Sequence, residues 1–287
     1  MLFVSSSCLN SDSIAEVIEK LAENKIRNIE LSGGTTYYDG MENDLKKLKR
    51  MYCLQYICHA YFPPPREPFV VNLASCDDRI YQKSIDHYEN CIDMLKRIEC
   101  KVLSIHAGFL VEINTNEIGK TIRGEKIYDE NKAYDRFCTA YEHIAGLCSK
   151  NKIALFLENN VLSKENYQNF HNKNLMMMTD YGSILKMKKQ IDFDLLLDLG
   201  HLNVSARTLG LDYTQQCEAL RAYAKWIHIS DNNGVFDEHK PIDPGSNILA
   251  EFSKLYKPDI NVTLETVGDI AEILESKKII ERCKTDR

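Results

Sequence analysis

Short apolar runs alternate with amphipathic segments along the whole of this 287-residue chain. The apolar runs are rich in β-branched and aliphatic side chains, which is typical of strands that are buried in a parallel sheet. They predict strands at residues 2–5, 28–31, 55–59, 102–106, 154–158, 195–198, 226–229 and 261–265. Between them, apolar residues spaced three and four apart predict helices at residues 14–22, 80–98, 136–149, 184–189, 213–224, 248–255 and 270–283.

The alternation of strands and helices indicates right-handed βαβ units on a parallel sheet. Eight such units in about 250 residues is the size of a (β/α)8 barrel. A doubly wound open sheet would usually carry a glycine-rich turn after its first strand, and residues 5–12 (SSSCLNSD) contain none. Polar residues after nearly every strand also favour a closed barrel, whose loops face one mouth. We therefore predict an α/β fold, a (β/α)8 TIM barrel, as a single domain over residues 1–287.

Charge and composition narrow the class of protein. The formal net charge of −6 argues against a surface that neutralises many phosphates. The ten cysteines form no C-x-x-C pair, and several fall inside apolar runs, so we expect reduced thiols and no disulfide framework. The segment MLFVSSSCLN lacks the features of a signal peptide, and no apolar run approaches the ~20 residues of a membrane span. These features predict a cytoplasmic protein without a membrane segment.

Four residues at the ends of the last four predicted strands are the strongest candidates for chemistry: Glu158, Asp198, His228 and Glu265. A lone acid in such a place is often the N-cap of the next helix. Four in consecutive strands, each after an apolar run, are harder to explain in that way, because a buried unpaired charge costs several kcal/mol. Carboxylate and imidazole are ligands of borderline-hard divalent metals. We predict that these four hold a shared metal at the carboxyl-terminal mouth of the barrel, and Mn²⁺, Co²⁺, Mg²⁺ and Zn²⁺ all suit them.

Further candidates surround the same mouth: His59, His106, His201, Asp237 and His239. His201 follows Asp198 by three residues and could bind a second metal, contact substrate or hydrogen-bond a ligand carboxylate. His59 and His106 end the third and fourth strands and are candidate substrate contacts. Glu30 ends the second strand, where it could face the mouth or pair with a lysine or arginine of the barrel.

Polar residues near the candidate ligands are suited to holding a substrate. Asn160 and Asn232 can hydrogen-bond hydroxyl groups, and Lys240 lies in the same loop as Asn232. Arg207 is a cation placed to meet a phosphate or carboxylate. Residues 111–131 (VEINTNEIGKTIRGEKIYDEN) form a polar insertion after the fourth strand, and we expect this segment to act as a lid over the mouth.

Short motifs at these strand ends resemble those of the xylose isomerase-like TIM-barrel superfamily. They are HAYFPPP, SIHAG, FLENN, LDLGH, HISDNNGVFDEH and LET, in that order along the chain. The resemblance runs over nearly the whole sequence. Each motif is short, and it is their order and strand placement together that are specific. The superfamily includes sugar and sugar-phosphate isomerases and epimerases, and also endonuclease IV, a nuclease that acts on abasic DNA.

The isomerase and epimerase branch implies one divalent metal, held by Glu158, Asp198, His228 and Glu265. In that branch the metal chelates two adjacent oxygens of a ketose and acidifies the neighbouring C–H. By resemblance, Glu158 and Glu265 would remove and return a proton through a metal-stabilised enediolate, with His201 on a substrate oxygen. The partner would be a small sugar or sugar phosphate, and barrels of this group often form homo-oligomers.

The endonuclease branch implies three zinc ions. The chain has a candidate for every ligand of that larger set: His59, His106, Glu158, Asp198, His201, His228, Asp237, His239 and Glu265. Against it stand the acidic balance and the lack of a basic, aromatic-rich loop after the early strands, since phosphate contacts supply most of the affinity for DNA. We therefore predict an isomerase or epimerase, with an abasic-site phosphodiesterase as the alternative and a lyase or dehydratase as a third class. A nucleic-acid partner is not expected.

Overall fold

A computed structural model describes residues 1–124 and 126–285, so that Glu125 of the expected lid and the last two residues, Asp286 and Arg287, lie outside it. Eight parallel strands close into a barrel in chain order, which confirms the predicted fold. The strands are β1 Leu2–Ser5, β2 Asn28–Leu31, β3 Gln55–His59, β4 Val102–His106, β5 Ala154–Glu158, β6 Asp194–Asp198, β7 Ala224–Ile229 and β8 Asn261–Leu264.

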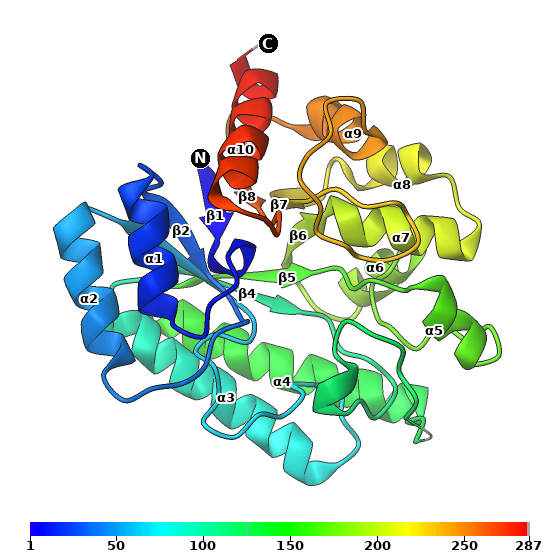
Figure 1. Cartoon of the computed structure of the whole chain (residues 1–287). Coiled ribbons are helices and arrows are strands. Elements are labelled where there is room, and N and C mark those ends of the chain that lie inside the picture. The colour runs from blue at the N-terminus through cyan, green and yellow to red at the C-terminus, as the bar shows by residue number, and fades with distance from the viewer. Residues whose placement is uncertain (125, 286–287) are drawn as a thin grey trace.

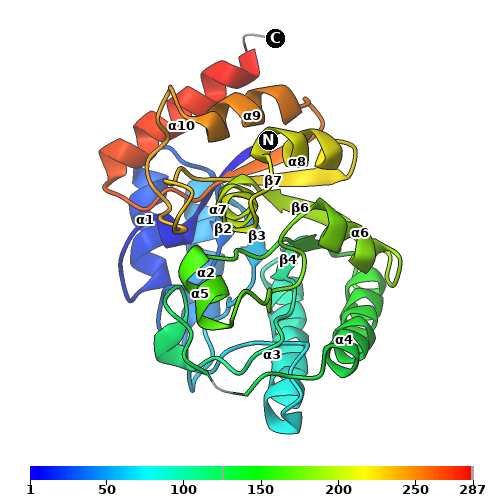
Figure 2. The ribbon, with the colours of Figure 1, turned by 90° about the vertical axis from the view of Figure 1, so that its right-hand side faces the viewer.

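Helices surround the strands on the outside of the ring (Figure 1). They are α1 Ile14–Glu23, α2 Met41–Tyr52, α3 Asp78–Arg97, α4 Glu130–Lys150, α5 Lys164–Asn169, α6 Tyr181–Lys188, α7 Leu199–Leu209, α8 Tyr213–Leu220, α9 Asn247–Leu255 and α10 Ile270–Thr285. The two longest, α3 and α4, pack side by side, and in the turned view α5 lies in front of the strands (Figure 2). The ring closes where β8 pairs with β1, through partners such as Leu2 and Val262.

The interior of the barrel has an apolar floor below its mouth. Phe3, Ile57, Leu196 and Trp226 pack together there, apart from the larger core between strands and helices. Because side chains alternate between the two faces of a strand, the residue two positions further on also points inward. Ile57, Leu196 and Trp226 are therefore followed by His59, Asp198 and His228, which lie at the mouth. Alternation along the strands thus places the apolar floor and, two residues further on, the polar ring of His59, Asp198 and His228 on the same strands.

The structure corrects two boundaries. Helix α7 begins at Leu199, directly after β6, so His201 lies in its first turn and not in a loop. The Asp198 carboxylate caps this helix by accepting the His201 backbone N–H at 2.6 Å. The helix predicted over residues 213–224 was wrong at its end, because α8 stops at Leu220 and Ala224 pairs with Leu195 in the sheet. Sheet pairing here overrides the helical preference of alanine.

The state of the cysteines and the character of the helices match what the sequence predicted, namely reduced thiols and no membrane segment. All ten cysteines are free, and most are buried in the apolar core, where a thiol behaves as a small hydrophobic side chain. The Sγ atoms of Cys58 and Cys91 lie 3.8 Å apart without a bond between them. Among the helices of residues 1–124 and 126–285, none is both long and apolar enough to cross a membrane.

The same substitution, glycine to alanine, should change the free energy of unfolding in opposite directions at two positions. A Cβ at Gly108, just after β4, would lie 2.5 Å from the Ala74 Cβ and 3.0 Å from Phe137 Cδ2, so Gly108→Ala should lower the free energy of unfolding by about 1–3 kcal/mol. A Cβ at Gly146, inside α4, would meet open space, and Gly146→Ala should raise it by about 0.5–1 kcal/mol. Urea titration followed by circular dichroism measures both. Equal midpoints for the two variants would contradict the packing described at Gly108.

Candidate metal centre

Glu158 lies at the centre of the mouth, at the end of β5, and is completely buried. Its two carboxylate oxygens face different imidazoles. Oε2 lies 3.2 Å from His59 Nε2 and 3.3 Å from His106 Nδ1, whereas Oε1 lies 3.3 Å from His228 Nδ1. Neither oxygen accepts a hydrogen bond of good geometry. Each oxygen of the Glu158 carboxylate is therefore available to a metal ion, and the two oxygens face different sets of neighbouring residues.

The four residues predicted to share a metal do converge. The ligand atoms of Glu158, Asp198, His228 and Glu265 lie within 4.8 Å of one another, and all four residues are buried. Glu265 Oε2 lies 3.3 Å from His228 Nδ1. Asp198 Oδ2 and His228 Nδ1 are buried without a hydrogen bond, which is costly unless a further group satisfies them. This donor set of three carboxylates and one imidazole fits a divalent cation.

A second group, from β3, β4 and β5, shares Glu158. The ligand atoms of His59, His106 and Glu158 also lie within 4.8 Å of one another. His59 is held by the Ser104 hydroxyl, 2.8 Å from Nδ1, and its Nε2 lies 3.1 Å from His106 Nε2. Both histidines that the sequence placed at the opposite flank of the mouth thus face the same carboxylate as His228.

A third group joins two distant segments across the mouth. Asp237 Oδ2 lies 3.1 Å from His201 Nε2 and 3.0 Å from His239 Nε2. His201 Nδ1 lies 2.8 Å from the Asn159 carbonyl oxygen, to which its N–H donates, so that Nε2 is the nitrogen left to face Asp237. Asp237 Oδ1 and His239 Nδ1 are buried and lack hydrogen-bond partners. The loop after β7 is therefore part of the site and not a solvated turn.

Glu30 contacts His228 on the side of the imidazole that faces away from the other candidate ligands. Its partner is a histidine and not the lysine or arginine considered from the sequence, because Glu30 Oε2 lies 3.0 Å from His228 Nε2. The same oxygen accepts from the Thr263 hydroxyl at 3.1 Å, and Thr263 in turn accepts from the Trp226 indole N–H at 3.0 Å. A proton on Nε2 directed at Glu30 leaves Nδ1 free towards the ligand carboxylates. Such a carboxylate behind an imidazole fixes its orientation and raises its basicity.

Charges within the centre compensate one another. Burial lowers the pKa of His59 to about 3, although Glu158 opposes this, so His59 is neutral. Burial would also lower the pKa of His228, but the surrounding carboxylates raise it well above its usual value. Burial would raise the pKa of Glu265, but His228 lowers it to about 2. Burial raises the pKa of Asp198 to about 7. The centre therefore contains ionised carboxylates and protonated imidazole side by side.

Besides His59 and His106, four side chains were predicted to contact substrate, and all four are engaged by the protein. Asn160 donates to three backbone carbonyl groups, and both ends of the Asn232 amide are hydrogen-bonded. Arg207 donates to a backbone carbonyl of the loop after β7, and Lys240 pairs with Glu238 at 2.7 Å. Of these four side chains, only Asn160 lines the cavity described next. Their role as substrate contacts stays a prediction.

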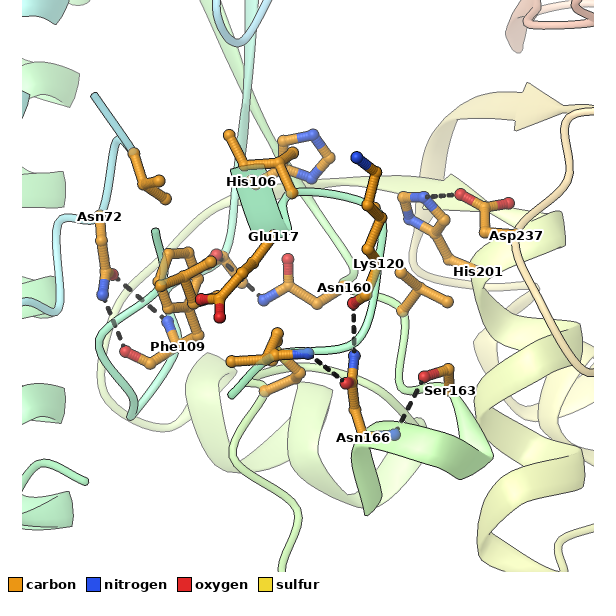
Figure 3. A pocket seen from close by; sticks show the side chains of 18 of the residues that line it. Asn72, His106, Phe109, Glu117, Lys120, Asn160, Ser163, Asn166, His201 and Asp237 are labelled. Carbon is orange, nitrogen blue, oxygen red and sulfur yellow. Dashed lines mark hydrogen bonds and ion pairs between the residues drawn. The ribbon is translucent and has the colours of Figure 1, made fainter. Parts of the chain in front are cut away.

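A cavity of about 570 Å³ opens beside the three ligand groups. His106, His201 and Asp237 form part of its wall, and residues 117–122 of the expected lid form another part (Figure 3). Asn166 of α5 holds that segment by accepting the Ile122 backbone N–H at 2.8 Å. No sequence signal marked α5 or Tyr88 of α3 as part of this wall, because helix periodicity does not show which helical side chains face the mouth.

Glu30→Gln should weaken binding of a divalent metal by roughly 10–100-fold, because glutamine keeps the shape but loses the charge behind His228. Competition between the protein and a chromophoric chelator for Co²⁺ measures the affinity. Glu251→Gln is the matched control, since Glu251 is a buried acid of α9 bonded to Thr214 and Lys254. Equal affinities for both variants would remove Glu30 from the centre.

Metal uptake should release protons at neutral pH. The pKa values of His228 and His201 are raised well above 6.5, and that of His239 to about 9, so the metal-free protein holds these protons up to alkaline pH. A cation in the four-residue group must displace the proton on His228, and cations that also bind His201 or His239 must displace theirs; the apparent affinity should rise by about tenfold per pH unit for each proton displaced. Titration with Zn²⁺ in weakly buffered phenol red measures the release. An affinity that is flat between pH 6 and 8 would contradict this protonation pattern.

Comparisons with known proteins agree with the barrel fold. The chain is 24% identical to the uncharacterized protein MJ1311 of Methanocaldococcus jannaschii over 97% of its own length and 87% of that protein's. A solved structure described as a D-tagatose 3-epimerase-like protein is 21% identical with a TM-score of 0.73, covering 99% of this chain and 96% of the other. Endonuclease IV from Thermus thermophilus is 12% identical with a TM-score of 0.62, covering 100% of this chain and 99% of the other. A family model of xylose isomerase-like TIM barrels matches residues 18–283, and the chain belongs to that family.

Proposed function

We propose that this chain is a divalent-metal-dependent isomerase or epimerase that acts on a small polyhydroxy ketone. The observation that carries the proposal is the pair of buried carboxylates Glu158 and Glu265. One oxygen of each lies 3.3 Å from His228 Nδ1, at the same mouth as the cavity that His106 and His201 line. The pKa of each is held low by neighbouring imidazoles, so both are in the base form at neutral pH.

A divalent cation held by Glu158, Asp198, His228 and Glu265 would polarise a carbonyl oxygen and acidify the adjacent C–H. The protein supplies the rest of the reaction. Glu158 and Glu265 come from β5 and from the residue after β8, and each can take a proton from carbon or return one. His201 lines the cavity with Nδ1 fixed by a backbone carbonyl and Nε2 3.1 Å from Asp237 Oδ2, so a substrate oxygen would share the Nε2–H with Asp237.

The cavity favours a small molecule over a polymer. Its volume of about 570 Å³ falls within the range of roughly 300–1,000 Å³ that small-molecule sites occupy. Lys120 is the single lysine or arginine among the described residues that line it, whereas a nucleic-acid site needs a cationic rim. The likeness to a protein described as D-tagatose 3-epimerase-like is in keeping with a sugar substrate.

A second function is favoured by one specific observation. The group His59–His106–Glu158 shares Glu158 with the four-residue group and could hold a further cation. His201 and His239 both face Asp237, at 3.1 and 3.0 Å, and add further possible ligands at the same mouth. Several cations around one bridging carboxylate can orient and activate water for attack on a phosphodiester. The likeness to endonuclease IV is in keeping with this alternative, a phosphodiesterase acting on abasic DNA.

Glu158→Gln and Glu265→Gln should each slow proton exchange by roughly 10²–10⁴-fold, because glutamine cannot accept the proton. The protein, saturated with Mn²⁺, is incubated in D₂O with D-fructose, D-tagatose, D-psicose or L-ribulose, and proton NMR follows loss of the C–H signal beside the carbonyl. Glu251→Gln is the control with full activity expected. Exchange that survives in both site variants with their metal retained would sink the assigned roles.

Elemental analysis of protein purified without chelator should find about one Mn, Co, Mg or Zn per chain, as chelation through the four-residue group requires. An abasic-site oligonucleotide should then remain intact. About three zinc ions per chain together with incision of that oligonucleotide would favour the phosphodiesterase. No metal at all, with none taken up on addition, would contradict both functions.

A further inference from the structure

The cavity beside the metal centre has an apolar wall that the ligand chemistry does not explain. Aliphatic and aromatic side chains make up half of its lining. They come from the loop after β3, from the segment after β4 and from the loop after β7, for example Val70, Leu73, Phe109, Ile118 and Phe236. A bare sugar, which carries a hydroxyl on nearly every carbon, would leave this wall without a matching surface.

The polar side chains in the same wall are already committed. Asn72 bonds to the backbone of Phe109 and Ala74, and Asn166 bonds to the backbone of residues 120 and 122. Asn160 is likewise saturated by three carbonyl groups. These amides build the wall and leave little capacity for a ligand's hydroxyls. They hold the segment after β4 against the barrel (Figure 3).

Two tyrosine hydroxyls in the wall are not committed in this way. Across residues 1–124 and 126–285, neither the Tyr61 nor the Tyr88 hydroxyl has a hydrogen-bond partner, and both side chains line the cavity. Tyr61 has a backbone φ of 66°, a left-handed conformation that costs energy for a large side chain and is often retained at ligand sites. The wall therefore offers a broad apolar surface with one or two isolated hydrogen-bonding points.

The charge of the wall argues against an anionic group. Away from His201, Asp237 and His239 of the metal centre, the charged side chains among the described lining residues are Lys120, Glu117 and Glu165. A phosphate or carboxylate in this part of the cavity would meet one cation and two anions, which gives no net attraction. An uncharged group in the same place would meet no electrostatic repulsion from these carboxylates.

The rim of the cavity is apolar as well. Ile118 and Phe236 line it and are 46% and 47% exposed, an unusual state for two large apolar side chains in the wall of one cavity. A ligand that covers them removes apolar surface from water, which is favourable in proportion to the area covered.

We infer that the substrate has two ends. A ketone with an adjacent hydroxyl reaches the metal centre, and an uncharged alkyl or aryl group fills the apolar wall lined by Val70, Leu73, Phe109 and Ile118. This inference rests on the proposed function for the first end and on the cavity for the second. It excludes a sugar phosphate as the preferred substrate and makes Ile118 a specificity-determining residue.

Hydroxamates test the inference, because they present two adjacent oxygens as an α-hydroxyketone does. The Co²⁺-loaded protein is titrated with acetohydroxamate, butanohydroxamate and hexanohydroxamate, and the visible spectrum reports binding. The Kd should fall by about threefold to fourfold for each added methylene. Adipic acid monohydroxamate, of the same length as the longest but with a terminal carboxylate, should bind more weakly than hexanohydroxamate. Tighter binding of the carboxylate would overturn the assignment to an uncharged group.

Ile118→Asn should weaken hexanohydroxamate at least threefold and leave acetohydroxamate unchanged. Ile127→Asn is the matched control: Ile127 lies in the same segment with a similar 45% exposure, against 46% for Ile118, but is not part of the cavity wall. Equal affinity of the wild type for all chain lengths would overturn the inference and leave the proposed function standing.

A second readout does not depend on the metal. The uncharged dye N-phenyl-1-naphthylamine should bind the metal-free protein with enhanced fluorescence, and Ile118→Asn should weaken it at least threefold relative to wild type and Ile127→Asn. If acetohydroxamate fails to change the Co²⁺ spectrum, the proposed function fails, and the dye alone then decides the inference. Identical dye binding by all three proteins overturns it.

Discussion

The whole mouth of the barrel depends on the burial of one carboxylate. Glu158 is fully buried, and an ionised carboxylate in such a place costs several kcal/mol unless other charges or donors compensate it. Imidazoles from β3, β4 and β7 supply part of that compensation at 3.2–3.3 Å. They reach Glu158 only because the strands close into a ring, so the electrostatics of the site and the topology of the fold require each other.

The same strands that bear the ligands also stabilise them from below. Trp226 belongs to the apolar floor, yet its indole N–H begins a hydrogen-bonded series that runs through Thr263 and Glu30 to His228. Because Trp226 and His228 are two positions apart, one strand orients both ends of this series. We therefore expect that repacking Trp226 in the floor would change the orientation of the His228 imidazole at the mouth. The effect would pass through the two polar side chains between them, Thr263 and Glu30.

The sequence predicted the strands, and it predicted that the candidate ligands meet at one mouth, because a single rule governs both. Period-two alternation and a carboxyl-terminal position place Glu158, Asp198 and His228 at one mouth without knowledge of any contact. This rule does not predict which side chains pair with each other in three dimensions. Glu30 pairs with a histidine 198 positions away along the chain, and Asn160 bonds to backbone that no motif marks. The wall of the cavity was not predicted either, since it joins segments that follow five different strands, β3 to β7.

A ligand set by itself does not determine the reaction in this barrel. Glu158 offers one oxygen to each of two groups, so the same residues can hold one cation or several, and the polar ring is compatible with proton transfer at carbon and with hydrolysis of a phosphodiester. What separates these reactions is the surface that a substrate must cross to reach the ring. Phosphate-rich substrates need an open cationic rim, whereas residues 117–122 and Phe236 bring apolar and acidic side chains to the edge of this cavity. We therefore expect the loops to select the substrate before it reaches the candidate ligands of the centre.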